Sequence, residues 1–292
     1  MTNPRLGASL SALSAFLAAA FFVPYKASTA HGAVDVLVIA LLLPAAVFNT
    51  VTALSNRSTP IRFDRTAIGV AILLAGGTVA GNVCATEALS RLDAGITSLI
   101  LQTQILFVSL ASWLVLRERI TSRFILGTII AGGGFAVVRL AGGGTVAASS
   151  TGAFYALGAA FSFGMMHVIT RKYITRIQPV PVNALRLWMA VLLLLMLPGR
   201  ANGLFELSST AWLLAGTAAL FGPFMARICI MYAVKHIPAS YSTLITITTP
   251  VFAFALEFIF LGTAPSPVEL LGGVIVLGGV AIPVMELARR QV

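Results

Sequence analysis

One arginine stands inside an otherwise apolar stretch of the sequence. Arg227 is the eighth residue of LFGPFMARICIMYAV, which covers residues 220–234. A charged side chain at the centre of a membrane helix costs about 2.5–3.5 kcal/mol on insertion scales, so it is expected to face other helices or water. A guanidinium can hold a carboxylate through two parallel charge-assisted hydrogen bonds. Arg227 is therefore the first candidate for a site that binds an anionic group.

Other polar and aromatic side chains are spaced so that they could complete this site. Thr78, Asn82 and Thr86 recur every four residues, which places them on one face of a helix. Their amide and hydroxyl groups offer donors and acceptors, and phenylalanines in the neighbouring runs could receive an apolar group. The predicted substrate-binding residues are Arg227, Asn82, Gln102, Thr86, Thr78, Ser98, His167, Phe22, Phe221, Phe224 and Thr243.

A structural role is the alternative for each of these residues. Arg227 could form an ion pair with Glu257 or Glu87 in place of binding a solute. Serine and threonine hydroxyls in helices commonly bond to their own backbone. His167 could line a cavity or make one hydrogen bond between helices. Arg186, near the start of its apolar run, is expected to reach the cytoplasmic surface with its long side chain.

The sequence carries no signature of catalysis. It lacks H-E-x-x-H, G-x-S-x-G, a P-loop and a pair of carboxylates within the apolar runs. Cys84 and Cys229 both lie inside apolar runs and have no metal-ligand spacing. We therefore predict no catalytic residue, no metal and no cofactor. An intramembrane enzyme and a lipid-handling scaffold remain the less favoured alternatives.

The composition places the chain in a membrane. Of its 292 residues 58% are hydrophobic and 10% are charged, with a mean hydropathy of +0.97, whereas soluble domains carry roughly 25% charged residues. The net charge of +10 comes from short basic clusters between apolar runs, so we predict no nucleic-acid partner. The fold class is an all-α polytopic membrane protein.

Ten apolar runs are long enough to span a bilayer. They cover residues 7–26, 34–54, 66–88, 95–116, 124–141, 151–174, 182–198, 211–234, 239–261 and 268–287. One alternate set of loops and tails carries 13 Lys or Arg residues and the other set carries 4, with the remaining two of the 19 inside spans. The positive-inside rule therefore predicts that both termini are cytoplasmic.

The sequence repeats itself at an offset of 145 residues. ALSRLDAGITSLILQTQILF (88–107) aligns with AVKHIPASYSTLITITTPVF (233–252), and Asn82 aligns with Arg227. We predict two five-helix repeats, 1–145 and 146–292. Because five is odd, the second repeat enters the membrane in the opposite direction. Such inverted repeats enclose a central cavity near the middle of the bilayer, which Asn82 and Arg227 are expected to approach from opposite sides.

Three prolines inside the predicted spans are expected to interrupt their helices. They are Pro24 in FFVPYK, Pro223 in FGPF and Pro250. Because proline lacks the backbone N–H, each of them leaves a carbonyl free that could face the cavity.

Residues 85–138 resemble the EamA-type repeat of the drug/metabolite transporter superfamily. The likeness rests on an apolar helix, the turn LRER at 116–119 and a glycine-rich helix after it; the second copy has Thr263 in place of the acidic residue. Within the superfamily the chain looks closest to bacterial aromatic amino-acid exporters of the YddG type. The resemblance implies a multi-pass protein of the bacterial inner membrane whose cavity is lined by helices 1, 3, 4, 6, 8 and 9.

These observations predict a carrier that exports an amino acid by alternating access. Its partners are a small-molecule substrate and the lipid bilayer, with no obligate protein partner. A drug, sugar or nucleotide carrier of the same fold is the alternative. The energy source is left open between proton coupling, for which His167 or Glu257 could titrate, and facilitated diffusion.

Overall fold

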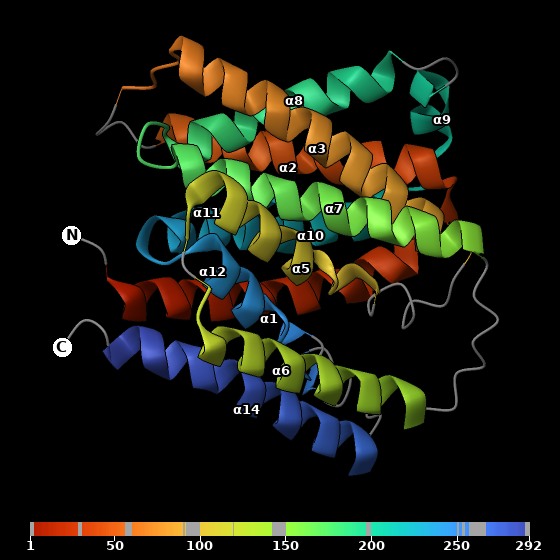
Figure 1. Cartoon of the computed structure of the whole chain (residues 1–292). Helices are drawn as coiled ribbons and strands as arrows, with labels where there is room; N and C mark the ends of the chain where they lie inside the picture. The colour runs from red at the N-terminus through yellow and green to blue at the C-terminus, as the bar shows by residue number, and fades with distance from the viewer. Residues whose placement is uncertain are drawn as a thin grey trace.

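The computed structural model shows a bundle of α-helices that lie side by side (Figure 1). It describes residues 3–28, 31–55, 60–89, 91, 100–118, 120–141, 150–196, 200–249, 251–252, 255–256 and 267–289. The helices are α1 (Pro4–Ser28), α2 (Val34–Ser55), α3 (Arg65–Leu89), α5 (Gln104–Ala111), η2 (Ser112–Leu116), α6 (Ser122–Ala141), α7 (Ser150–Tyr173), α8 (Pro179–Leu195), α9 (Arg200–Glu206), α10 (Ser209–Ala219), η3 (Leu220–Ala226), α11 (Arg227–His236), α12 (Ala239–Thr246) and α14 (Pro267–Arg289).

The helices have the length and surface of membrane spans. Five helices among the described residues are long and apolar enough to cross a bilayer, and three shorter apolar helices accompany them. Large apolar side chains cover the outside of the bundle; Phe154 is 75% exposed, Val274 67% and Ile129 66%. Exposed apolar side chains at this density need a hydrocarbon solvent. The chain is thus an all-α, multi-pass membrane protein, as its composition predicts.

Two of the three predicted helix interruptions can be compared with the structure, and the one at Pro24 is wrong. Helix α1 continues through Pro24 to Ser28, because neighbouring helices hold the helix in place when a single backbone bond is lost. At Pro223 the chain widens into the π-helix η3 between α10 and α11. Pro250 lies outside the described residues. The short helix α9 was not predicted.

The helices form a central group flanked on two sides. α6 packs against α14 on one side of the bundle, and α2 and α3 pack against α8 on the other, with α1, α5, α7, α10–α11 and α12 between them (Figure 1). α3 packs against α7, and the segments 145 residues away, α10–α11 and α1, pack against each other in the same way. The start of α1 and the end of α14 lie at the same end of the bundle (Figure 1).

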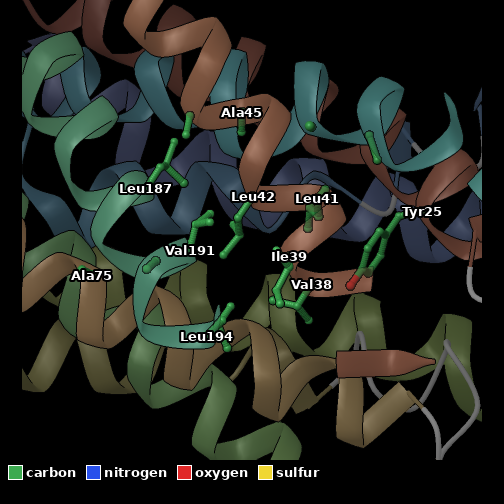
Figure 2. Packing of buried hydrophobic residues seen from close by; sticks show 14 residues of the cluster. Tyr25, Val38, Ile39, Leu41, Leu42, Ala45, Ala75, Leu187, Val191 and Leu194 are labelled. Atoms are coloured by element: carbon green, nitrogen blue, oxygen red, sulfur yellow. The ribbon is translucent and has the colours of Figure 1, made fainter. Parts of the chain in front are cut away.

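An apolar cluster fixes the α2–α8 side of the bundle. Figure 2 shows Leu41 and Leu42 of α2 together with Leu187, Val191 and Leu194 of α8, all at most 1% exposed. Close packing of such side chains supplies dispersion contacts that lipid alone does not replace. This cluster holds α8 in a fixed rotation, so its polar residues point into the bundle.

Glycines allow the backbones of α6 and α14 to touch. A Cβ atom on Gly127 would lie 2.5 Å from the Gly279 carbonyl oxygen, and one on Gly134 would lie 2.8 Å from the Gly272 carbonyl oxygen. The two glycines of α14 are those of α6 displaced by 145 residues (272 − 127 and 279 − 134). The later glycine of each helix meets the earlier glycine of the other, so the two helices are antiparallel. Fifth helices of inverted repeats meet in this way.

Replacing one glycine of this contact should destabilise the bundle. In Gly279→Ala the new Cβ would lie 2.4 Å from the Ala131 nitrogen, so α6 must move, and we expect the free energy of unfolding to fall by about 1–3 kcal/mol. The control is Gly278→Ala, where a Cβ has no neighbour within 4 Å and stability should hold or rise. Denaturation of the purified protein in detergent measures both; equal effects of the two variants would contradict this packing.

Candidate functional site

Arg227 points into the bundle and is held by α7. Its Nη2 donates a hydrogen bond to the Thr170 hydroxyl oxygen at 3.0 Å and a longer one to the Met166 carbonyl oxygen at 3.5 Å. The Thr170 hydroxyl itself donates to the Met166 carbonyl at 2.6 Å, which leaves its lone pairs for the arginine. The Nε atom of Arg227 is buried and has no hydrogen-bond partner. At least this donor of the guanidinium is thus still available.

Arg227 is not neutralised by any carboxylate among the described residues. Glu87, one of the two predicted partners, pairs with Arg91 one helical turn away. Glu257, the other, lies outside the described residues. Both acceptors that Arg227 meets are neutral oxygens, so the described part of the chain gives no support to a structural ion pair.

Arg186 is a second buried guanidinium, and the prediction that it reaches the cytoplasmic surface is wrong. It is 2% exposed. Its Nε donates to Asn183 Oδ1 at 2.6 Å and its Nη1 donates to Thr78 Oγ1. Arg186 lies seven residues after Pro179, where α8 begins, which is about 10 Å along the helix. The side chain turns inward because α3 and α8 offer acceptors there.

Two buried asparagines hold this guanidinium in place. Asn183 Nδ2 donates to Asn49 Oδ1 at 2.7 Å and to the Pro223 carbonyl at 3.3 Å. Asn49 Nδ2 in turn donates to the Ala45 carbonyl at 2.7 Å. The chain of bonds therefore links α2, α8 and the π-helix η3. The site prediction missed Asn49, Asn183, Arg186 and Thr170. The same signal that marked Asn82, a costly polar group inside an apolar run, was available for Asn49 and Arg186.

His167 and Thr243 lie next to this region and bind each other. His167 Nδ1 and Thr243 Oγ1 are 2.9 Å apart, which joins α7 to α12. Thr243 is fully buried. Of the two roles considered for His167, lining a cavity and making a hydrogen bond between helices, the structure shows the hydrogen bond.

The polar side chains of α3 lie on one face of the helix, as predicted, but most of their hydrogen bonds go to backbone carbonyls of α3 itself. Asn82 Nδ2 donates to the Thr78 carbonyl at 2.8 Å, and the Thr86 hydroxyl donates to the Asn82 carbonyl at 2.7 Å. Tyr25 of α1 meets Thr86, with 3.2 Å between their hydroxyl oxygens. Thr78 is the member that reaches the arginines, through Arg186.

Asn82 and Arg227 lie at different depths. Arg227 precedes the end of α11 at His236 by nine residues (236 − 227), or about 14 Å. Asn82 follows the start of α3 at Arg65 by 17 residues (82 − 65), or about 26 Å. These two helix ends lie on the same side of the bundle, since Ile61 and Lys235 line one hollow. Inversion of the repeats places equivalent residues at opposite depths.

The remaining predicted site residues are spread over the bundle. Gln102 Oε1 is buried without a hydrogen-bond partner. The ring of Phe224 packs against Phe48 of α2, with centroids 5.8 Å apart, and Phe221 is half-buried. Ser98 and the side chain of Phe22 lie outside the described residues.

Two hollows lie among the residues that the structure describes, and Arg227 lines neither of them. The larger has a volume of about 340 Å³ and lies at the ends of α2, α8 and α11, between Thr52, Gln178 and Lys235. The smaller, about 160 Å³, lies between Arg123 and Glu286. The central cavity stays a prediction; in this conformation Arg186 is buried and Arg227 is half-buried between the helices.

A carboxylate links three helices at the end of the bundle where α7 and α11 end. Glu118, of the LRER turn, accepts hydrogen bonds from Arg171 Nε at 3.3 Å, from the Ala239 N–H at 3.3 Å and from the Ser240 hydroxyl at 3.4 Å. Arg171 also donates to the Val234 carbonyl. Glu118 therefore joins the ends of α7 and α11 to the first turn of α12, where an anion complements the free N–H groups of a helix.

The helices and the site together define a class of protein, a multi-pass membrane protein with a buried cationic site between its helices. The chain belongs to the EamA-like transporter family, which matches residues 5–140 and again residues 150–285. The two matches are 145 residues apart (150 − 5 and 285 − 140), the offset at which the sequence aligns with itself.

Named relatives and a solved structure are similar to the chain. The "Uncharacterized transporter YdfC" of Bacillus subtilis is 27% identical over 200 residues, 68% of this chain and 65% of that protein. The "Probable terminal-alkyne amino-acid exporter" of Streptantibioticus cattleyicolor is 28% identical over 193 residues, 66% and 64% of the two chains. The matches thus span just under two thirds of each relative. A crystal structure of a protein 19% identical to this one has the same fold, with a TM-score of 0.79 over 94% of this chain and 97% of that one.

Removing the Glu118 carboxylate should loosen this end of the bundle. In Glu118→Ala the Ala239 N–H and the half-buried Arg171 lose their acceptor, and we expect the free energy of unfolding to fall by about 2 kcal/mol, the range of hydrogen bonds to charged groups. Glu87→Ala is the control, because its pair with Arg91 is exposed to solvent and should contribute far less. Detergent-solubilised protein unfolded by heat reports both, and a Glu118 variant as stable as the parent would refute this role.

Proposed function

We propose that the protein exports amino acids, aromatic or other apolar ones, and related small metabolites across the bacterial inner membrane by alternating access. The observation that carries this proposal is the buried Nε of Arg227, a charged donor without an acceptor. A buried donor left without a partner is unfavourable unless a ligand supplies the acceptor during the transport cycle. Membership of a transporter family and the printed name of one relative, an amino-acid exporter, support the same reading.

An amino acid matches the unpartnered groups in chemical type. Its carboxylate accepts from Arg227 in the paired geometry that guanidinium and carboxylate favour. Its ammonium is a donor, and Gln102 Oε1 is a buried acceptor without a partner. Aromatic rings of the same bundle, Phe221 and Phe224, receive an apolar side chain.

The proposed cycle uses the two repeats, 1–145 and 146–292, as the parts that move against each other. In the proposed orientation both termini lie in the cytoplasm, which the excess of Lys and Arg in the loops on that side supports. In this proposal lipid surrounds the bundle and no obligate protein partner takes part.

The test is transport of labelled L-phenylalanine by the purified full chain in proteoliposomes. Arg227→Ala should lower the rate at least tenfold, because a charge-assisted bond to the carboxylate is worth at least about 1.4 kcal/mol, a factor of ten. Arg227→Lys should recover only part of this rate, since an ammonium cannot form the paired contact.

The control is Arg176→Ala, which removes an exposed arginine in the turn after α7 and should leave transport unchanged. Expression and melting temperature of each variant show that the fold is intact. Parental transport rates in Arg227→Ala would sink the assignment. A panel of unlabelled drugs, sugars and nucleotides in the same assay separates an amino-acid carrier from a carrier with another substrate class.

A further inference from the structure

Arg186 and Arg227 form one cluster between α3, α7 and α8. Arg186 donates to the Thr78 hydroxyl, and that hydroxyl is 3.9 Å from the sulfur of Met166. The carbonyl of the same Met166 accepts from Arg227. The two guanidiniums are therefore linked to the same residue, Met166: Arg186 through the Thr78 hydroxyl and Arg227 through the Met166 carbonyl.

Only neutral groups hold these two charges among the described residues. Arg186 donates to Asn183 and Thr78, and Arg227 donates to Thr170 and to a backbone carbonyl. Neither arginine has a carboxylate within ion-pair distance in the described part of the chain; the ion pairs found there are Arg91–Glu87 and Arg171–Glu118. Two like charges buried without an anion are costly, and an anionic ligand removes that cost.

We infer that Arg186 and Arg227 together bind the carboxylate of the solute, and that the carboxylate alone, without an amino group, is enough for recognition. The substrate class is then apolar carboxylates, of which amino acids are one kind. This inference rests on the proposed function and deepens it by naming the group that is recognised.

The charge balance of the cluster is the reason that the ammonium is not required. A zwitterion adds one positive charge to a site that already has two, whereas a simple carboxylate adds only the negative charge. The groups near the arginines are also already engaged, since His167 binds Thr243 and Asn183 binds Asn49. No described acidic side chain stands there to receive an ammonium.

The asparagine pair makes Arg186 a prepared binding group and not a mobile side chain. Asn183 accepts from Arg186 Nε and donates to Asn49 and to the Pro223 carbonyl. The guanidinium is thus held before a ligand arrives, so little side-chain entropy is lost on binding. Asn183 acts through Arg186 and is a positioning residue.

Competition in proteoliposomes of the parent protein tests the inference. We expect 3-phenylpropanoate, which lacks the amino group, to inhibit uptake of labelled L-phenylalanine at concentrations within about threefold of those needed for unlabelled L-phenylalanine. We expect 2-phenylethylamine, which lacks the carboxylate, to be at least about tenfold weaker, because it makes none of the charge-assisted bonds. Inhibition by the amine and not by the acid would overturn the inference.

Arg186→Gln tests the second guanidinium. It removes the charge while keeping a side chain that can donate to Thr78, and we expect inhibition by 3-phenylpropanoate to weaken about tenfold or more. Arg176→Gln, at an exposed position in the turn after α7, is the matched control and should behave like the parent. If Arg186→Gln does not fold, Arg186→Lys replaces it, and the competition with the parent protein decides in any case. An Arg186 variant that folds and is inhibited like the parent would contradict the role of Arg186.

The two proposals fail in different ways. If Arg227→Ala abolishes phenylalanine transport but 3-phenylpropanoate does not compete, amino-acid export stands and recognition of the carboxylate alone is wrong. If the parent does not transport phenylalanine, the proposed function is wrong, and binding is then tested on the purified chain by its melting temperature. A rise with 3-phenylpropanoate and none with 2-phenylethylamine would support the carboxylate site, and the absence of such a rise would refute it.

Discussion

Two guanidiniums buried in an apolar bundle are the constraint on which the architecture around them depends. Each needs acceptors that lipid cannot supply, so α3, α7 and α8 must present Thr78, Thr170 and Asn183 at the right rotations. The π-helix η3 belongs to the same arrangement. Its Pro223 carbonyl is met by Asn183, which also orients Arg186. The irregular part of this helix therefore lies where a buried amide can satisfy it.

The helix packing is equivalent in the two repeats, whereas the buried charged residues are not. The glycines of α6 and α14 meet in pairs related by 145 residues. The buried arginines have no charged counterparts, because Arg227 aligns with Asn82 and Arg186 aligns with Leu41, a member of the apolar cluster in Figure 2. A bundle can keep a symmetric frame, which sets how its halves move, and still place its charges in only one half.

The spans and the repeat were predictable from the sequence because they depend on local composition and on periodic spacing. The predicted span 66–88 is α3 within a residue at each end, and the span 34–54 is α2. The direction of Arg186 was not predictable, since seven residues into a helix a long side chain can reach either water or the interior. The packing of α2 and α3 around α8 decides which of these two directions the Arg186 side chain takes. Asn82 could be marked as costly, but its bond to the Thr78 carbonyl depends on a rotamer that spacing does not reveal.

The depth of the two arginines in the bundle bears on the direction of the proposed transport. Arg186 lies about 10 Å and Arg227 about 14 Å from the helix ends at one side of the bundle, the side whose loops hold most of the basic residues. Farther in, Asn82, Thr86 and Tyr25 are neutral and bond to one another or to backbone. Under the proposed function, a carboxylate that enters from the basic side reaches the arginine pair first. Release toward the other side then depends on weakening the contact with the two arginines, because the described polar groups farther in, Asn82, Thr86 and Tyr25, carry no charge.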